Sequence, residues 1–226
     1  MEITWMGQAG LLFQKDGLNI MIDPYLSDSV KKIEPNNYRR VPVCERFFDI
    51  KPDVLIITHC HLDHLDPETL DVFFSKFSGI TVLAPDGCWQ TLRQTYKGNN
   101  NYVLFNAGTR WTQNGVTFKA VKAEHSDKNA IGVVIVDDKT YYATGDTLCN
   151  DEVIAFAKKE NPGVVFLPVN GVGNNMNMVD GAFFCNQINS DVLAVPVHTG
   201  LFDSLDAHDF PYENKVVPTM YQKIEL

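Results

Sequence analysis

The segment 58–64, Thr-His-Cys-His-Leu-Asp-His, constrains this chain more than any other part of its sequence. It directly follows the apolar run Asp53–Ile57, which predicts a buried strand. Side chains alternate between the two faces of an extended chain, so His59 and His61 leave the strand end on the same side and can bind one ion. Asp63 and His64 are adjacent and converge only if the chain turns there, which suits a second ion. The segment therefore predicts a site for two metal ions.

Length and composition favour a single domain, residues 1–226, because 226 residues that are 45% hydrophobic can bury a substantial core. No apolar run approaches the roughly 20 residues that a membrane span needs, and the start of the sequence does not resemble a secretory leader. Five cysteines without C-x-x-C spacing indicate neither a disulfide framework nor a thiolate zinc cluster. Free thiols suit a reducing compartment, so we expect a cytoplasmic protein without membrane contact.

The net charge of −9 argues against a nucleic-acid partner, which normally needs a clustered basic surface. The exception is local: the segment 25–49 holds five basic residues and lacks clear periodicity. A loop this long inside a compact domain is often functional. Its arginines suit bidentate contacts to anions, although an ordinary solvated face is the alternative. We therefore consider Arg39 and Arg40 as substrate contacts, together with Asn170, which follows a predicted strand.

Strands and helices come in an order typical of layered α/β proteins. Two strands, Glu2–Met6 and Leu18–Ile22, are expected around the apolar run 11–13. A helix should begin at Pro67 with Asp66 as its N-cap, and a second helix, Cys88–Tyr96, should be capped by Asp86. Further expected strands are Ile80–Ala84, Tyr102–Phe105, Trp111–Gln113, Val116–Ala123, Gly132–Val136, Thr140–Thr144, Val164–Val169 and Val192–Val197, with helices at Asp151–Lys159 and Asp180–Asn189. The two batches of strands predict two sheets packed face to face with helices outside, a four-layer αββα sandwich.

Further metal-binding side chains follow other predicted strands. His125, Asp146 and His198 each come directly after one, and with the segment 58–64 they account for five of the six histidines. Ligands at strand ends share one edge of a sandwich. By contrast, Cys60 should face away from its histidine neighbours as a small buried side chain, and Trp5 and Gln8 are expected to serve packing and the first turn.

These residues resemble those of the metallo-β-lactamase superfamily, αββα metal-dependent hydrolases, over nearly the whole chain. The resemblance implies that His59, His61 and His125 hold the first metal ion and that Asp63, His64 and His198 hold the second, with Asp146 bridging them. The segments 3–10, 22–25, 144–146, 167–171 and 196–198 are similar to the branch that contains L-ascorbate-6-phosphate lactonase. The region 123–127 follows the general superfamily pattern more clearly than that branch.

Ligand chemistry predicts the mechanism. Water or hydroxide shared by two cations is a nucleophile near neutral pH, the ions stabilise the developing oxyanion, and Asp63 or Asp146 can carry the proton to the leaving group. Imidazole and carboxylate ligands suit zinc, iron or cobalt and accept manganese, which the lactonase resemblance also favours. The redox diiron members of the superfamily have Glu where this chain has His61, so an oxygenase is not expected.

We therefore expect a hydrolase with two divalent metal ions, zinc or manganese with iron as a further choice. It would open a lactone or cleave an ester or phosphoester of a small anionic, sugar-phosphate-like molecule. A phosphodiesterase or ribonuclease of the same fold and a non-catalytic metal-binding module are the alternatives. A homo-oligomer is a further possibility, because the apolar segments 201–205 and 210–221 could form a contact between copies of the chain.

Overall fold

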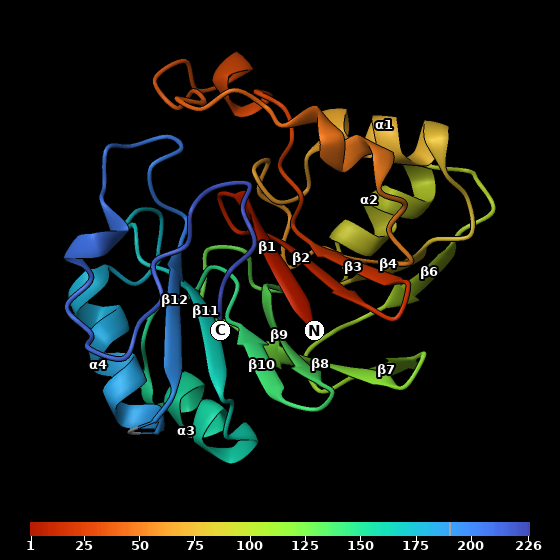
Figure 1. The fold of residues 1–226 in the computed structure, drawn as a ribbon. Coiled ribbons are helices and arrows are strands. Elements are labelled where there is room, and N and C mark those ends of the chain that lie inside the picture. The colour runs from red at the N-terminus through yellow and green to blue at the C-terminus, as the bar shows by residue number, and fades with distance from the viewer. Residues whose placement is uncertain (190) are drawn as a thin grey trace.

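The computed structural model describes residues 1–189 and 191–226 of the chain, and these form four layers, as the sequence predicts (Figure 1). Two six-stranded sheets pack face to face in the middle. Helices α1 and α2 cover the outer face of the first sheet, and α3 and α4 cover the outer face of the second. Their bounds are α1 Pro67–Lys76, α2 Cys88–Thr95, α3 Asp151–Glu160 and α4 Met178–Ile188.

The first sheet follows chain order from an antiparallel meander into parallel strands. Its strands are β1 (Glu2–Gly7), β2 (Gly10–Lys15), β3 (Leu18–Ile22), β4 (Val54–Ile56), β5 (Thr81–Ala84) and β6 (Asn101–Leu104). The pairs β1–β2 and β2–β3 are antiparallel, and β3 to β6 are parallel. Strand β4 is buried along its whole length, as expected for a strand covered on both faces.

The second sheet repeats this arrangement in reverse. Its strands are β7 (Arg110–Gln113), β8 (Val116–Lys122), β9 (Ile131–Val136), β10 (Thr140–Ala143), β11 (Val164–Pro168) and β12 (Leu193–Val197), in the spatial order β12-β11-β10-β9-β8-β7. The strands β7 to β10 are antiparallel, and β10 to β12 are parallel. Parallel strands end at the same edge of a sheet, so residues that follow β10 and β12 are brought together.

Alternation along the strands divides the core into three apolar layers. In β4, Val54 and Ile56 face the second sheet, whereas Leu55 between them faces α1 and α2. Phe13 of β2 packs edge-on against Phe166 of β11, with ring centroids 5.6 Å apart, and so joins the two sheets at their centre. Burial of apolar side chains on both faces of each sheet stabilises the sandwich, by about 25 cal/mol for each Å² of apolar surface removed from water.

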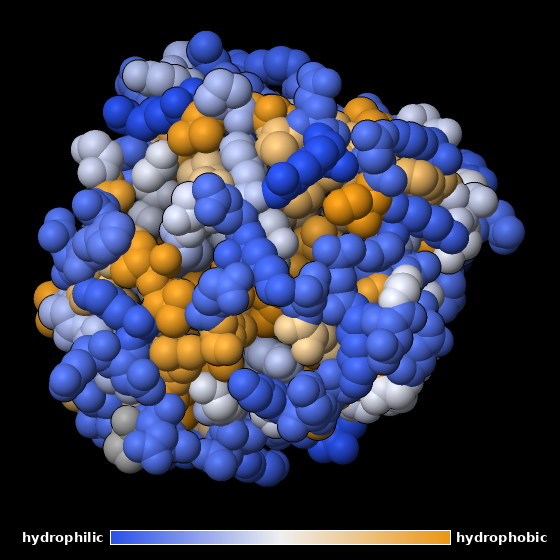
Figure 2. Space-filling model, in the orientation of Figure 1, coloured by the Kyte–Doolittle hydropathy of each residue, from blue (hydrophilic) through white to orange (hydrophobic). Residues whose placement is uncertain are grey.

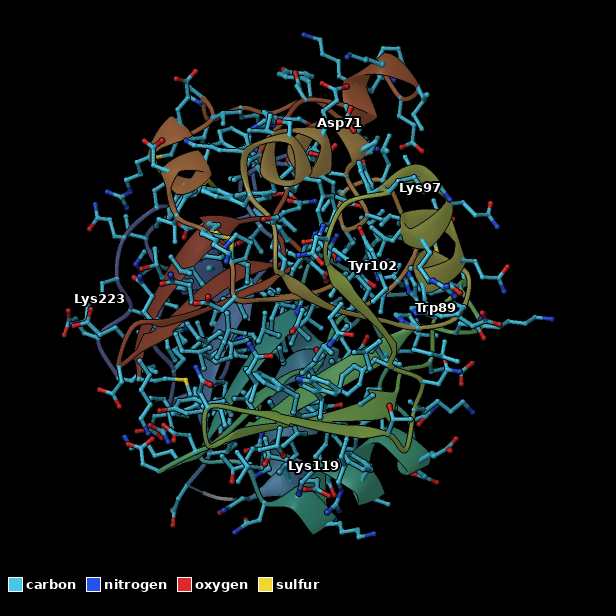
Figure 3. The ribbon with its side chains drawn as sticks, turned by 90° about the vertical axis from the view of Figure 1, so that its right-hand side faces the viewer. Asp71, Trp89, Lys97, Tyr102, Lys119 and Lys223 are labelled. Carbon is cyan, nitrogen blue, oxygen red and sulfur yellow. The ribbon has the colours of Figure 1, made fainter. Side chains whose placement is uncertain are left out.

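Polar contacts fix the outer helices to their sheets. The indole N–H of Trp89 in α2 donates to the Tyr102 carbonyl of β6 at 3.1 Å, where the two residues lie together in Figure 3. Lys119 of β8 lies over α3 (Figure 3) and pairs with Glu160 at 2.5 Å. Lys223 pairs with Glu2 at 2.7 Å and holds the end of the chain beside β1.

Three local expectations need correction. The apolar run 11–13 is itself a strand, β2, so the chain opens with a three-stranded meander. Gly87, not Asp86, is the N-cap of α2, and the Asp86 carboxylate instead accepts from Gln90 at 2.7 Å. Helix α4 begins before Asp180, because Asn177 caps it and Asp180 completes a capping box. The Asp66 cap of α1 is confirmed.

The surface seen in Figure 2 is largely hydrophilic, with an apolar area near the middle of this face, over the region of β11 and β12. None of the helices in the described part of the chain is long and apolar enough to cross a membrane. The segment 25–49 crosses one edge of the sandwich (orange in Figure 1) and contains two short 3-10 helices, Val30–Lys32 and Glu45–Asp49.

Candidate metal centre

The predicted metal ligands lie together at one edge of the sandwich. Residues 59–64 follow β4 of the first sheet, and the other ligands follow β8, β10 and β12 of the second. The Ile131 N–H donates to the Thr58 carbonyl at 3.1 Å and joins the two sheets directly beneath this edge. The His198 N–H donates to the Gln8 carbonyl at 3.0 Å and does the same on the other side. The site is therefore built across the interface of the two sheets.

Three imidazole nitrogens converge in a first group. Nε2 of His59 lies 3.0 Å from Nδ1 of His61, and Nε2 of His125 lies 3.1 Å from the same atom. Tetrahedral ligands at the usual zinc–nitrogen distance are about 3.3 Å from one another. The three nitrogens are thus spaced as ligands of one ion.

A second group combines a carboxylate with two imidazoles. Oδ2 of Asp63 lies 3.2 Å from Nε2 of His198 and 3.8 Å from Nε2 of His64. Oδ2 of Asp146 lies 3.4 Å from the His64 nitrogen and 3.6 Å from the His198 nitrogen. The rings of His59 and His64 have centroids 4.0 Å apart, so the two groups adjoin.

Two buried atoms at the centre of the site fit a cation. In residues 1–189 and 191–226, Nε2 of His64 and Oδ1 of Asp146 are buried without a hydrogen-bond partner. Leaving a buried polar atom unpaired costs about 1–3 kcal/mol, and more when it is charged. A divalent ion held by the second group would satisfy Nε2 of His64, and this mixed nitrogen and oxygen donor set suits zinc, manganese or iron.

Electrostatics differ between the two groups. Burial lowers the pKa of His59 well below its ordinary value and also lowers the pKa of His125, so both rings are neutral, as metal ligands must be. Burial would also lower the pKa of His64, but the carboxylates of Asp146 and Asp63 outweigh it and raise that pKa well above its ordinary value. The raised pKa of His64 means that, without metal, a proton on this ring offsets the negative charge of the two carboxylates. A bound cation would supply that positive charge instead of the proton.

Asp23 supports this site, a role that the sequence analysis did not assign to it. Its fully buried carboxylate accepts from the Thr58 N–H at 2.8 Å and from the Thr58 hydroxyl. Its Oδ2 also lies 2.8 Å from Nδ1 of His64. A carboxylate there holds the proton on Nδ1 and leaves Nε2 free for a metal ion. The only indication of this role in the sequence was its acidic side chain directly after β3, the strand that pairs with β4.

We expect Asp23→Asn to weaken metal binding by about 10- to 100-fold, because partners that orient a ligand typically contribute that much. The asparagine keeps the shape of the side chain but loses the charge that orients the His64 ring. A competition titration against a chromophoric chelator measures the effect. Unchanged affinity would show that Asp23 serves the fold alone, and circular dichroism checks that the variant is folded.

Gln8 belongs to the site, contrary to the expectation that it serves the first turn. Its Nε2 donates to Oδ2 of Asp63 at 2.9 Å and lies 3.4 Å from Nε2 of His198. Asn175, which the sequence did not single out, donates to Oδ2 of Asp146 at 2.8 Å. Each of these amides therefore holds one of the two catalytic carboxylate candidates in place.

The three candidate substrate contacts separate in the structure. The Asn170 amide lines the site and lies 3.1 Å from Nδ1 of His198. Arg39 and Arg40 are not brought to the site. The Arg39 guanidinium donates to the carbonyls of Tyr25 and Val41, at 2.8 and 3.2 Å, and so braces the loop. Arg40 lies over the Tyr38 ring, 5.6 Å from its centroid.

Cys60 is exposed and lines the cavity, contrary to the expectation that it is a small buried side chain. Its N–H donates to the Asp127 carboxylate at 2.9 Å, and its thiol lies beside the buried Cys88. The chain turns after β4 to place Asp63 and His64, and this turn also exposes Cys60. The alternation of side chains along a strand does not predict that exposure.

Three residues at this edge have left-handed backbone, in which side chains other than glycine are disfavoured. They are Gln8, Asp23 and His198, with φ of 51°, 43° and 63°. Such residues gather at functional sites, where the surrounding structure supports the strain. Gly145, immediately before Asp146, has a φ of 61° as well. A Cβ there would lie 2.6 Å from the Ile131 carbonyl oxygen.

We expect Gly145→Ala to destabilise the fold by about 2–3 kcal/mol, since left-handed backbone alone costs alanine 1–2 kcal/mol and the Ile131 carbonyl must also move. Urea unfolding followed by circular dichroism measures the change. Gly115→Ala is the control for backbone alone, because Gly115 has a φ of 81° but nothing within 4 Å of a Cβ. Equal losses in the two variants would contradict the close contact.

A cavity of about 540 Å³ opens over the two groups. Its floor includes His61, Asp63, His125, Asp146 and His198. Its wall comes from loops after β3, β11 and β12. A space of this size accepts a small molecule, in the range typical of ligand sites.

Residues 2–201 match the family model described as the beta-lactamase superfamily domain. The chain belongs to the beta-lactamase superfamily. A superfamily member from Thermoplasma acidophilum, a UPF0173 metal-dependent hydrolase, is 27% identical over 218 residues, which are 92% of this chain and 87% of that protein. The chain is thus related to metal-dependent hydrolases over almost its full length.

Solved structures of other proteins share the fold. An isothiocyanate hydrolase from Delia radicum gut bacteria has a TM-score of 0.79 at 19% identity and covers 100% of this chain and 99% of its own. A possible metal-dependent hydrolase of Veillonella parvula has a TM-score of 0.82 at 17% identity, with the same coverage of 100% and 99%. These matches confirm the metallo-β-lactamase fold that the sequence predicts.

Proposed function

We propose that this chain is a dinuclear metal-dependent hydrolase that opens a lactone or cleaves an ester or phosphoester of a small molecule. The observation that carries the proposal is the pair of adjoining ligand groups on the floor of one cavity. When bound, two divalent ions lower the pKa of coordinated water and polarise the bond under attack. Zinc, manganese and iron all suit the donor set.

Each residue has a role in this proposal. His59, His61 and His125 would hold the first ion and Asp63, His64 and His198 the second, with Asp146 as the shared ligand. Asp63 and Asp146 also face the cavity, so either carboxylate can carry a proton to the leaving group. Gln8 and Asn175 hold those carboxylates in place.

The alternatives lack a supporting contact. Binding of nucleic acid calls for basic residues along the site, and in the described residues the cavity wall includes neither lysine nor arginine. A non-catalytic metal-binding module would use the same ligands, and only an activity measurement separates it from an enzyme. The resemblance to ascorbate-6-phosphate lactonase supports a lactone as the first substrate class to test.

The test begins with elemental analysis of protein purified without chelator and without a nickel column. We expect about two equivalents of metal for each chain, as the two ligand groups predict. Protein loaded with zinc, manganese or iron is then assayed on lactones, carboxylic esters, phosphoesters and isothiocyanates. Turnover of any of these supports the hydrolase. Full loading with no turnover on the whole panel would favour the non-catalytic module.

A further inference from the structure

The cavity wall above the metal ligands has an unusual composition for a site that would take an anion. Apolar side chains line it from the four loops that follow β3, β4, β11 and β12, and two of these side chains are largely exposed to solvent: Ile33 is 68% exposed and Val172 is 65% exposed. Val30, Leu62 and Phe202 complete the apolar part. Apolar side chains left uncovered around a cavity favour a substrate with an apolar body.

The charged side chains of the wall are acidic. Glu34 and Asp203 line it in addition to the ligand carboxylates, and in residues 1–189 and 191–226 neither forms an ion pair. Oδ1 of Asp203 accepts from the N–H groups of Gly200 and Leu205, at 2.8 and 2.9 Å, so the carboxylate is fixed in position. Oε2 of Glu34 accepts from the Asn37 amide at 2.6 Å.

The nearby basic residues have other partners. Lys32 pairs with Glu68 at 2.5 Å, and Lys31 lies 3.9 Å from Asp28. Arg46 donates to the Tyr221 carbonyl, and Arg39 and Arg40 make the contacts described above. No cation of this loop therefore offsets the two acidic residues of the wall.

We propose that the cavity selects substrates whose body beyond the reacting bond is apolar and either uncharged or cationic, and that Glu34 and Asp203 exclude anions. This rests on the proposed hydrolytic function of the same site and replaces the anionic substrate expected from the sequence. The reacting carbonyl would lie at the metal ligands, and the rest of the molecule would extend towards Ile33, Val172 and Phe202. A carboxylate or phosphate on that part would meet two like charges.

The first test uses three p-nitrophenyl esters of similar size: the neutral pentanoate, the anionic glutarate monoester and the cationic 4-(trimethylammonio)butanoate. We expect kcat/KM for the anionic ester to be at least about tenfold below that for the other two, a difference that salt reduces because it screens exposed charges. The double variant Glu34→Gln/Asp203→Asn should raise the anionic value relative to the neutral value. Glu45→Gln, an exposed acid outside the cavity, is the matched control.

An equal or higher kcat/KM for the anionic ester would overturn the proposal, and so would a double variant with the same discrimination as the parent. Failure of all three esters would remove carboxylic esters from the substrate classes of the proposed function, and a second measurement then decides the charge selection. It compares the rates at which dianionic dipicolinate and neutral 1,10-phenanthroline remove metal from loaded protein. The double variant should accelerate dipicolinate alone, by about fivefold or more, and an unchanged ratio would overturn the proposal.

Discussion

His61→Ala is expected to bind about one metal ion per chain where the parent protein binds two, and to lose about 1000-fold or more in hydrolytic rate. The reason is the position of Nδ1 of His61, which lies 3.0 Å from the His59 nitrogen and 3.1 Å from the His125 nitrogen. Its removal leaves two imidazoles for the first ion, fewer than a stable site normally uses. Elemental analysis and initial rates measure the two effects on the same samples.

His208→Ala is the matched control, because His208 is the sixth histidine of the chain, is exposed and pairs with Asp206 at 2.7 Å outside the cavity. It should keep the metal content and the rate of the parent. If His61→Ala also kept both metal ions and full turnover, the first ligand group would be wrong.

The second large effect is expected for Asp146→Asn, which should lower the hydrolytic rate by about 1000-fold and weaken binding of the second ion. The buried carboxylate provides the negative charge that faces His64 and His198 at 3.4 and 3.6 Å. An amide of the same shape keeps the contact volume but supplies neither the charge nor an equivalent metal ligand. Rates with saturating metal separate lost chemistry from lost binding.

Asp138→Asn provides the matched control for that change. Asp138 is exposed at the turn between β9 and β10, and its carboxylate accepts from the neighbouring Lys139 N–H, at 3.0 Å. This variant should behave as the parent in rate and metal content. Full turnover in Asp146→Asn would contradict its proposed role as the shared ligand.

The grouping of the candidate metal ligands could be predicted because each one follows a strand whose apolar pattern is clear in the sequence. The residues that support them could not. Gln8 and Asp63 are 55 positions apart. Their hydrogen bond exists only because the loops that follow β1 and β4 come together at one edge of the sheet, although β2 and β3 lie between those two strands. The role of Asp23 likewise depends on the pairing of β3 with β4, which no local pattern of the sequence specifies.

Arg39 illustrates a different limit. Its charge suggested an anion contact, but a guanidinium has five donors, and backbone carbonyls can also accept from them. In the structure the carbonyls of Tyr25 and Val41 do so. Composition indicates that a cation is present in a loop, whereas the direction of the side chain depends on the shape of that loop.

The left-handed backbone at Gln8, Asp23 and His198 has a consequence for protein engineering. Glycine adopts this conformation without the strain of about 1 kcal/mol that another residue bears, so relief of backbone strain taken alone favours glycine at all three positions. Each such exchange would remove a side chain that has a place in the proposed metal site. Directed evolution for heat tolerance should therefore hold these three positions fixed. Otherwise it could select variants of higher thermal stability in which the proposed metal site is incomplete.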